Sequence, residues 1–355
     1  MRNQRNSRIE VLRILTMFFI ILSHSCSIGI LNQFSFEQQV RFTSVYAFAS
    51  VASIAGGIGN CIFMIITGYY LSDKVQVSWD KNITLLIKLT IYYWVLLILY
   101  YILGEHSIDK VTLIKMIFPF YFGYSWYVTA YVIFCTFIPI LNKMIESLDI
   151  KMLSRLILLL FIFGLLLPTF SMSTFMYSSM YLLLISYLSS GAYIKRNIDN
   201  ISTVKMRNIA LLSIMGLIFS VLCFCFMGKI TSKPIWFTKS GFLGRALGSI
   251  FALSIFAYLV KQKSFNVPSI NKVGSSMLGV YILHDNPVVA SWYWKVNFPF
   301  YLEGYEHWIL FNLIKVIALF GVLLILELFV NRFFEGFFRY CSNKIYRILG
   351  SLTDG

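Results

Sequence analysis

The chain has 355 residues, of which 58% are hydrophobic, 17% are aromatic and 13% are charged. A soluble globular domain carries about 25% charged residues, so this composition excludes an ordinary soluble fold and indicates a membrane protein. The net charge of +15 fits basic loops that lie against anionic lipid headgroups, and it does not require a nucleic-acid partner.

Apolar runs of about 20 residues, the length that crosses a bilayer as a helix, recur along the whole chain. We therefore predict an all-α, polytopic membrane protein with about ten transmembrane helices and membrane lipids as its surroundings. In chain order, the predicted spans are residues 11–30, 48–71, 84–103, 125–141, 153–170, 176–194, 208–227, 241–260, 273–293 and 308–330.

The basic residues predict the orientation of these spans, because Lys and Arg concentrate near their cytoplasmic ends. An orientation with both termini and the even-numbered loops in the cytoplasm puts more than two-thirds of the 30 Lys and Arg residues on that side. We therefore expect both termini to be cytoplasmic, with a cytoplasmic tail at about residues 331–355.

The cysteines and histidines give no sign of a metal centre. The six cysteines include no C-x-x-C pair, and the four histidines form no His-rich cluster in the sequence. This pattern favours neither disulfides nor a bound metal.

The first span carries three ionisable residues on one helical face. Arg13 and His24 are 11 residues apart, which places them about 20° apart around a helix and about 16 Å apart along it. Glu10 lies one turn before Arg13 and can pair with it. Ionisable groups inside a membrane usually face the interior of the helix bundle, so we expect this stripe to line an internal cavity. The alternative is that Arg13 reaches lipid phosphates and that His24 only joins two helices by a hydrogen bond.

The residue types in this stripe suggest a chemistry. A neutral imidazole can take a proton from a hydroxyl at physiological pH, and a guanidinium suits phosphate groups. A coenzyme A thioester has its phosphates at one end and its reactive group at the tip of a long, thin arm. Such a ligand would fit between Arg13 and His24.

Four segments resemble, in order, the motifs of the acyltransferase-3 family of integral membrane acyltransferases. IEVLR followed by LSH, which contain Glu10, Arg13 and His24, resembles its first-helix signature, and IFMIITGYYL resembles its second-helix pattern, with Thr67 in place of Ser. SWYVTAYVIFCTFIPILNKMI and SSMLGVYILHDNP resemble its W-[FY]-x-x-x-Y segment and its late histidine motif. The resemblance covers essentially the whole chain, and the last two segments are especially similar to members that acetylate bacterial surface polysaccharides.

The resemblance implies a single transmembrane acyltransferase domain over residues 1–355, without an appended soluble domain, in a bacterial cytoplasmic membrane. Family members move an acyl group, commonly acetyl from cytosolic acetyl-CoA, to a hydroxyl of a cell-surface glycan or lipid-linked sugar. His24 matches the essential first-helix histidine and Arg13 the basic residue before it, while Glu10 would orient Arg13. A homo-oligomer is compatible with these expectations.

One motif departs from the family pattern. Members often have an R-x-x-R pair at the start of the third helix that engages the acyl donor, whereas this chain has only Lys81 and Lys88 there. Lysine can bind phosphate as a point charge but lacks the two-pronged geometry of arginine. We expect Lys88 to contribute to donor binding and Lys81 to contribute less.

A second histidine lies at a similar predicted depth. If the ninth span begins near Val273, His284 is 11 residues along it, and Pro287 interrupts the helix just beyond. Irregular backbone inside a membrane is tolerated where it is buried in protein or lines a cavity. We therefore expect His284 to assist proton movement or to bind the acceptor; the alternative is a polar break near the outer surface, with Asp285 facing solvent.

Three questions stay open at the level of sequence. His24 could act as a base while the hydroxyl attacks the thioester directly, or it could carry the acyl group itself. A proton-coupled transporter or polysaccharide flippase would also use buried histidines. A third alternative is a non-catalytic partner of a glycan assembly machine.

Overall fold

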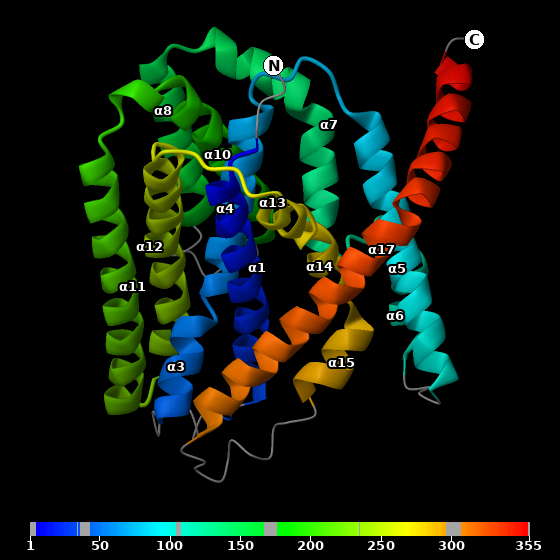
Figure 1. Ribbon diagram of the computed structural model, residues 1–355. Helices are drawn as coiled ribbons and strands as arrows, with labels where there is room; N and C mark the ends of the chain where they lie inside the picture. The colour runs from blue at the N-terminus through cyan, green and yellow to red at the C-terminus, as the bar shows by residue number, and fades with distance from the viewer. Residues whose placement is uncertain are drawn as a thin grey trace. The chain divides into compact units, whose positions relative to one another are not determined.

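The computed structural model describes residues 5–33, 35, 43–103, 108–166, 176–233, 235–295 and 307–353, and within them all regular structure is helical (Figure 1). This confirms the predicted all-α class. The described chain divides into two compact units.

The first unit contains the segments Met1–Asp73, Met144–Gly274 and Asn297–Leu319. Its helices are α1 (Ser7–Ser27), η1 (Leu31–Gln33), α3 (Ser44–Ala52), α4 (Ala55–Leu71), α8 (Ile150–Phe161), the π-helix η2 (Ile162–Leu166), α10 (Met176–Arg196), η3 (Ile198–Asn200), α11 (Thr203–Thr231), α12 (Ile235–Val260), most of α13 (Pro268–Ser275) and the beginning of α17 (Trp308–Thr353).

The second unit contains the segments Lys74–Lys143, Ser275–Val296 and Phe320–Gly355. Its helices are α5 (Trp79–Ile102), α6 (Lys110–Ile117), most of α7 (Trp126–Ser147), α14 (Met277–His284), α15 (Pro287–Lys295) and the remainder of α17.

Several helices begin at a polar residue whose side chain accepts a hydrogen bond from a backbone amide of the first turn. Asn6 accepts from Arg8 at the start of α1, and Asp149 accepts from Lys151 and Met152 at the start of α8. Such caps satisfy amides that have no partner inside the helix. With these caps, α1 and α8 begin within a few residues of the starts of the predicted spans 11–30 and 153–170.

Seven helices among the described residues are long and apolar enough to cross a membrane. They are Ser7–Ser27, Ser44–Leu71 (α3 and α4 with the turn between them), Trp79–Ile102, Trp126–Ser147, Thr203–Thr231, Leu243–Val260 within α12 and Trp308–Ile348 within α17. Each overlaps one of the ten predicted spans, so the protein is a multi-pass membrane protein.

The other three predicted spans have different outcomes. The fifth begins as α8 and η2 and then runs into residues 167–175, which lie outside the described residues. The sixth is helix α10, as predicted. The ninth is not one helix, because α13, α14 and α15 divide it into three short helices.

The predicted interruption before Pro287 is present. Helix α14 ends at His284 and α15 begins at Pro287. Asn286 accepts a hydrogen bond from the amide of Val288 through its side chain at 3.0 Å, so it caps α15, and Pro287 takes the first helical position, where its missing amide costs nothing. A second break, at Ser276 between α13 and α14, has no proline to indicate it in the sequence.

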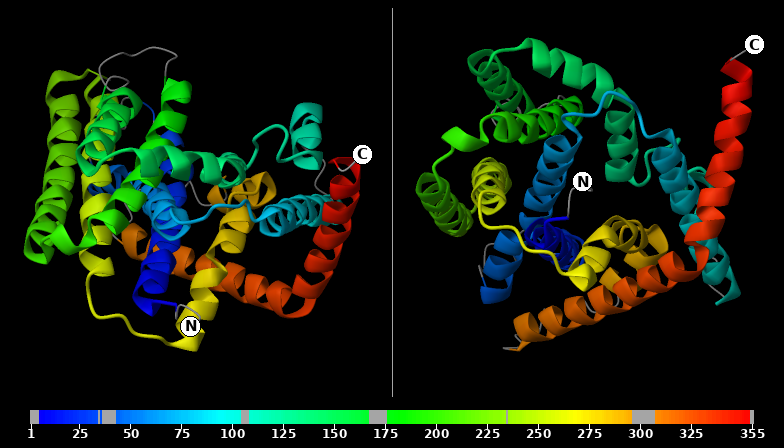
Figure 2. Two further views of the ribbon diagram at one scale, coloured as in Figure 1. Left: turned by 90° about the horizontal axis from the view of Figure 1, so that it is seen from above. Right: turned by 45° about the horizontal axis from the view of Figure 1, so that its top comes forward.

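The last helix extends beyond its predicted span. Helix α17 has 46 residues and continues through the expected tail to Thr353. Figure 2 shows that it bends along its length, where its colour passes from orange to red.

Two glycines allow α4 and α10 to pack backbone against backbone in the first unit. A Cβ added to Gly68 would overlap the carbonyl of Leu188, and a Cβ added to Gly191 would overlap the backbone of Ile65 and Tyr69. Small residues at a helix contact allow this close approach, which gains van der Waals packing where lipid provides no hydrophobic drive. Helices α11 and α12 form a second tight pair, side by side in Figure 1.

We predict that Gly191→Leu destabilises the protein by at least about 1–3 kcal/mol, because the new side chain meets fixed backbone on α4. Gly57→Leu is the matched control, since a Cβ there meets nothing within 4 Å. Thermal unfolding of the two purified variants measures the difference. Equal melting temperatures for the two variants would show that α4 and α10 can move apart without loss of stability.

Candidate functional site

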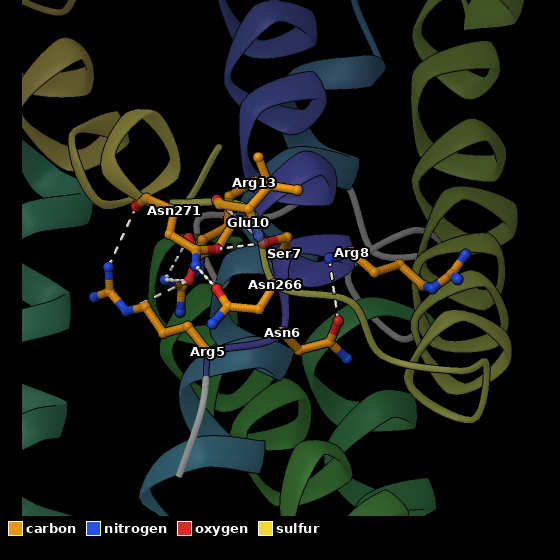
Figure 3. Close-up of polar contacts among 9 residues, drawn as sticks. Arg5, Asn6, Ser7, Arg8, Glu10, Arg13, Asn266 and Asn271 are labelled. Atoms are coloured by element: carbon orange, nitrogen blue, oxygen red, sulfur yellow. Dashed lines mark hydrogen bonds and ion pairs between the residues drawn. The ribbon is translucent and has the colours of Figure 1, made fainter. Parts of the chain in front are cut away.

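The first turns of α1 hold a buried carboxylate between two arginines (Figure 3). Glu10 is only 4% exposed. The Nη1 atom of Arg13 lies 3.2 Å from both carboxylate oxygens of Glu10, and the Nε atom of Arg5 lies 3.9 Å from one of them. Two cations therefore face one anion, which leaves a net positive charge at this end of α1.

Helix α13 and the segment just before it fix the start of α1 in this position. The amide of Ser7 donates to the carbonyl of Phe265 at 2.9 Å, and its hydroxyl donates to the side-chain oxygen of Asn271 at 2.7 Å. Gly274 packs directly on Glu10, because a Cβ at this glycine would overlap the Glu10 side chain. Neither Asn271 nor Gly274 had a signal in the sequence, since both come from a distant segment.

Arg13 keeps donors for a ligand. Its ion pair with Glu10 uses Nη1, and among the described residues neither Nε nor Nη2 has a hydrogen-bond partner. The side chain of Arg13 is 23% exposed, against 6% for that of Glu10. A guanidinium held on one edge and open on the other can bind an anion such as phosphate.

His24 lies on the same face of α1, half-buried, about 16 Å further along the helix. Met17, Ile20 and Ile21 lie within about 60° of it around the helix and are all at most 1% exposed. On the far side, Leu15 is 50% and Phe19 is 45% exposed. The face that bears Arg13 and His24 is therefore turned away from the exposed surface.

The neighbours of His24 fix the rotation of α1 at its level. The Ser23 hydroxyl donates to the carbonyl of Ser53 at 2.6 Å, and the Ser25 hydroxyl donates to the side-chain oxygen of Asn312 at 2.6 Å. The two serines lie about 100° to either side of His24. Two anchors in different directions fix the side of α1 from which His24 projects.

A cavity of about 410 Å³ lies beside α1. Its walls are almost entirely apolar and include Leu12, Leu15, Thr16 and Phe19 of α1, together with residues of α4, α11 and α12. Leu15 and Phe19 lie on the far side of α1 from His24, and neither Arg13 nor His24 lines the cavity. This cavity is therefore not the channel expected along the polar stripe.

In the second unit, His284 ends α14 and is fully buried. Its Nδ1 atom lies 2.8 Å from the carbonyl oxygen of Tyr281. A carbonyl only accepts hydrogen bonds, so Nδ1 carries the proton, and in the neutral ring the lone pair is on Nε2. The Tyr281 ring also packs edge-on against the imidazole, with centroids 5.2 Å apart. The Tyr281 carbonyl thus sets the tautomer of His284.

Lys88 lies in a buried network in the second unit. Its ammonium donates to the carboxylate of Glu327 and, at 2.8 Å, to the side-chain oxygen of Asn331. The Tyr92 hydroxyl donates to the other carboxylate oxygen of Glu327 at 2.6 Å. Glu327 is 1% exposed, and this ion pair offsets its charge. Lys81, by contrast, is exposed in the first turn of α5.

The structure therefore brings some predicted site residues together. Glu10 contacts Arg13, as expected, and His24 shares their face. His284 and the two lysines belong to the second unit, and their roles in transfer stay predictions. Glu327 was missed, although a single carboxylate within the apolar run 308–330 is itself a signal of function or pairing.

Comparison with protein families identifies the family of the chain. The model of the acyltransferase-3 family, described as an acyltransferase domain, matches residues 6–330. The chain belongs to the acyltransferase-3 family. It is a membrane acyltransferase, and the matched region begins just before the Glu10–Arg13 pair of α1. No curated protein and no solved structure matches the chain.

We predict that Lys88→Met destabilises this acyltransferase by about 3–5 kcal/mol, because it leaves the buried Glu327 carboxylate without its cation. The double variant Lys88→Met/Glu327→Gln removes both charges and should recover much of the loss. Thermal unfolding in detergent provides the measurement, with the exposed Lys344→Met as control. A double variant no more stable than Lys88→Met would contradict a direct coupling of the two groups.

Proposed function

We propose that this acyltransferase moves an acetyl group from cytosolic acetyl-CoA to a hydroxyl of a cell-surface glycan or lipid-linked sugar, in a bacterial cytoplasmic membrane. The observation that carries the proposal is the arrangement along α1. A buried carboxylate holds Arg13 at one end of the helix, and His24 lies on the same face about three turns further along.

Arg13 is the donor-binding group in this proposal. The phosphates of acetyl-CoA bind the guanidinium edge that Glu10 leaves open, and the thioester at the other end of the coenzyme reacts at His24. Glu10 is a positioning residue, since it fixes Arg13 and does not touch the donor. The excess of positive charge from Arg5 and Arg13 favours an anionic ligand here.

His24 is the general base. Its neutral imidazole takes the proton of the acceptor hydroxyl as that oxygen attacks the thioester carbonyl. The carbon–sulfur bond breaks, the coenzyme leaves as a thiolate, and the imidazolium returns the proton to this sulfur. The products are an acetyl ester and free coenzyme A, so the enzyme is unchanged after each cycle.

We predict that His24→Ala lowers ester formation by about 10²–10⁴-fold, the usual contribution of a positioned base. Surface glycan is isolated from cells that carry the wild-type chain or the variant at equal membrane abundance. NMR then counts the ester-linked acetyl groups.

His307→Ala is the matched control, since this histidine is exposed beside the start of α17. Full acetylation in His24→Ala cells would refute the role of His24. Loss of the whole glycan, rather than of its esters, would favour a transporter or flippase.

We predict that Arg13→Ala weakens acetyl-CoA binding by about tenfold or more, because a charged hydrogen bond contributes about 1.5–3 kcal/mol. Calorimetry on purified protein measures the affinity. Arg8→Ala is the matched control, because it also removes one positive charge from α1. The Arg8 guanidinium donates to the carbonyl of Lys263 at 2.9 Å and points away from Glu10 (Figure 3). Equal affinities for the two variants would remove Arg13 from the donor site.

A further inference from the structure

A second cavity, of about 500 Å³, lies in the first unit among α8, α10, α11 and α12. No residue of α1 lines it, so it is separate from the site proposed above. One end is polar: Asn197, Asn200 and Ser202 come from the connection between α10 and α11, and Lys205 comes from the first turn of α11. This end of the cavity therefore lies where two helices end and begin.

The remainder of the cavity wall is mostly apolar, with the hydroxyl-bearing side chains Ser154, Ser190, Tyr193 and Ser254 among its aliphatic ones. Helix α12 contributes Ile250, Leu253 and Ala257, and α11 contributes Met206 and Ile209. From Ala257 to Ile250 the wall extends about 10 Å along the helix axis. Since α11 and α12 both contain segments apolar enough to cross a membrane, this wall lies at the depth of lipid chains.

Within the described residues, the polar end carries one cation without a protein partner. Lys205 is the only charged residue among those that line the cavity, and its ammonium bonds no residue in the described part of the chain. The neighbouring Lys261 donates to the backbone carbonyls of Ile201 and Asp199 at 2.7 and 3.3 Å and so holds the turn in place. The Asp199 side chain does not line the cavity.

We propose that this cavity binds an anionic phospholipid, with its phosphate at Lys205 and part of an acyl chain against α12. A cation at the polar end of an apolar wall matches a molecule that is anionic at one end and aliphatic at the other. The basic side chain attracts an anionic headgroup, and the wall removes part of the chain from contact with other lipids. Free phosphate would use only the polar end and leave the wall uncovered.

Native mass spectrometry of the full chain in a mild nonionic detergent tests this proposal with phosphatidylglycerol as the probe. Lys205→Ala should weaken binding by about fivefold, as expected for one basic residue near a headgroup. Arg207→Ala is the matched control, because this exposed arginine is on the same helix end, contacts Asn208 and does not line the cavity. Equal loss in both variants would overturn the site.

A second variant tests the apolar wall. Leu253→Trp adds bulk where the chain would lie, so it should reduce phosphatidylglycerol binding even with Lys205 intact. Inorganic phosphate should not displace the lipid from the wild-type protein. Displacement by phosphate, or unchanged binding in Leu253→Trp, would show that the cavity does not hold a lipid chain. Because Lys205 is exposed, Lys205→Ala keeps the test interpretable if the tryptophan variant fails to fold.

Discussion

The cost of placing a charge inside a membrane governs the polar residues of this protein. A carboxylate in hydrocarbon is stable only with a partner, and both buried glutamates described above have one: Arg13 holds Glu10, and Lys88 holds Glu327. The two pairs differ in what they leave available. Lys88 is enclosed by acceptors from α17, whereas the outer edge of Arg13 bonds no other described residue. The same constraint therefore gives an enclosed pair in one unit and a pair with an open guanidinium edge in the other.

Sequence reasoning recovered what depends on local spacing. Residue periodicity predicts the helix content, most of the spans and the Glu10–Arg13 pair. The backbone chemistry of proline predicts the interruption before Pro287. These features need no knowledge of which helices meet. The start of α1 shows the limit, because Asn271 and Gly274 complete the Glu10 environment from a segment about 260 residues away in the chain.

The same limit explains the expectation for Lys88. From sequence alone it is a basic residue near the start of a helix, in the place where relatives have arginine. Its acceptors, Glu327 and Asn331, lie on the last helix, so no pattern in the sequence around Lys88 could predict them. The cavity expected along the Arg13–His24 face of α1 also depended on tertiary packing. The apolar cavity that borders α1 is lined by neither of these two residues.

The backbone contact of α4 with α10 has a consequence for motion. A joint formed by Gly68 and Gly191 has no side chains that could change rotamer to absorb a shift. Sliding one helix past the other would drive carbonyl oxygens into neighbouring main chain, so the two helices should move as one rigid body. Any conformational change that admits substrates must then hinge elsewhere, at interfaces built from adaptable side chains.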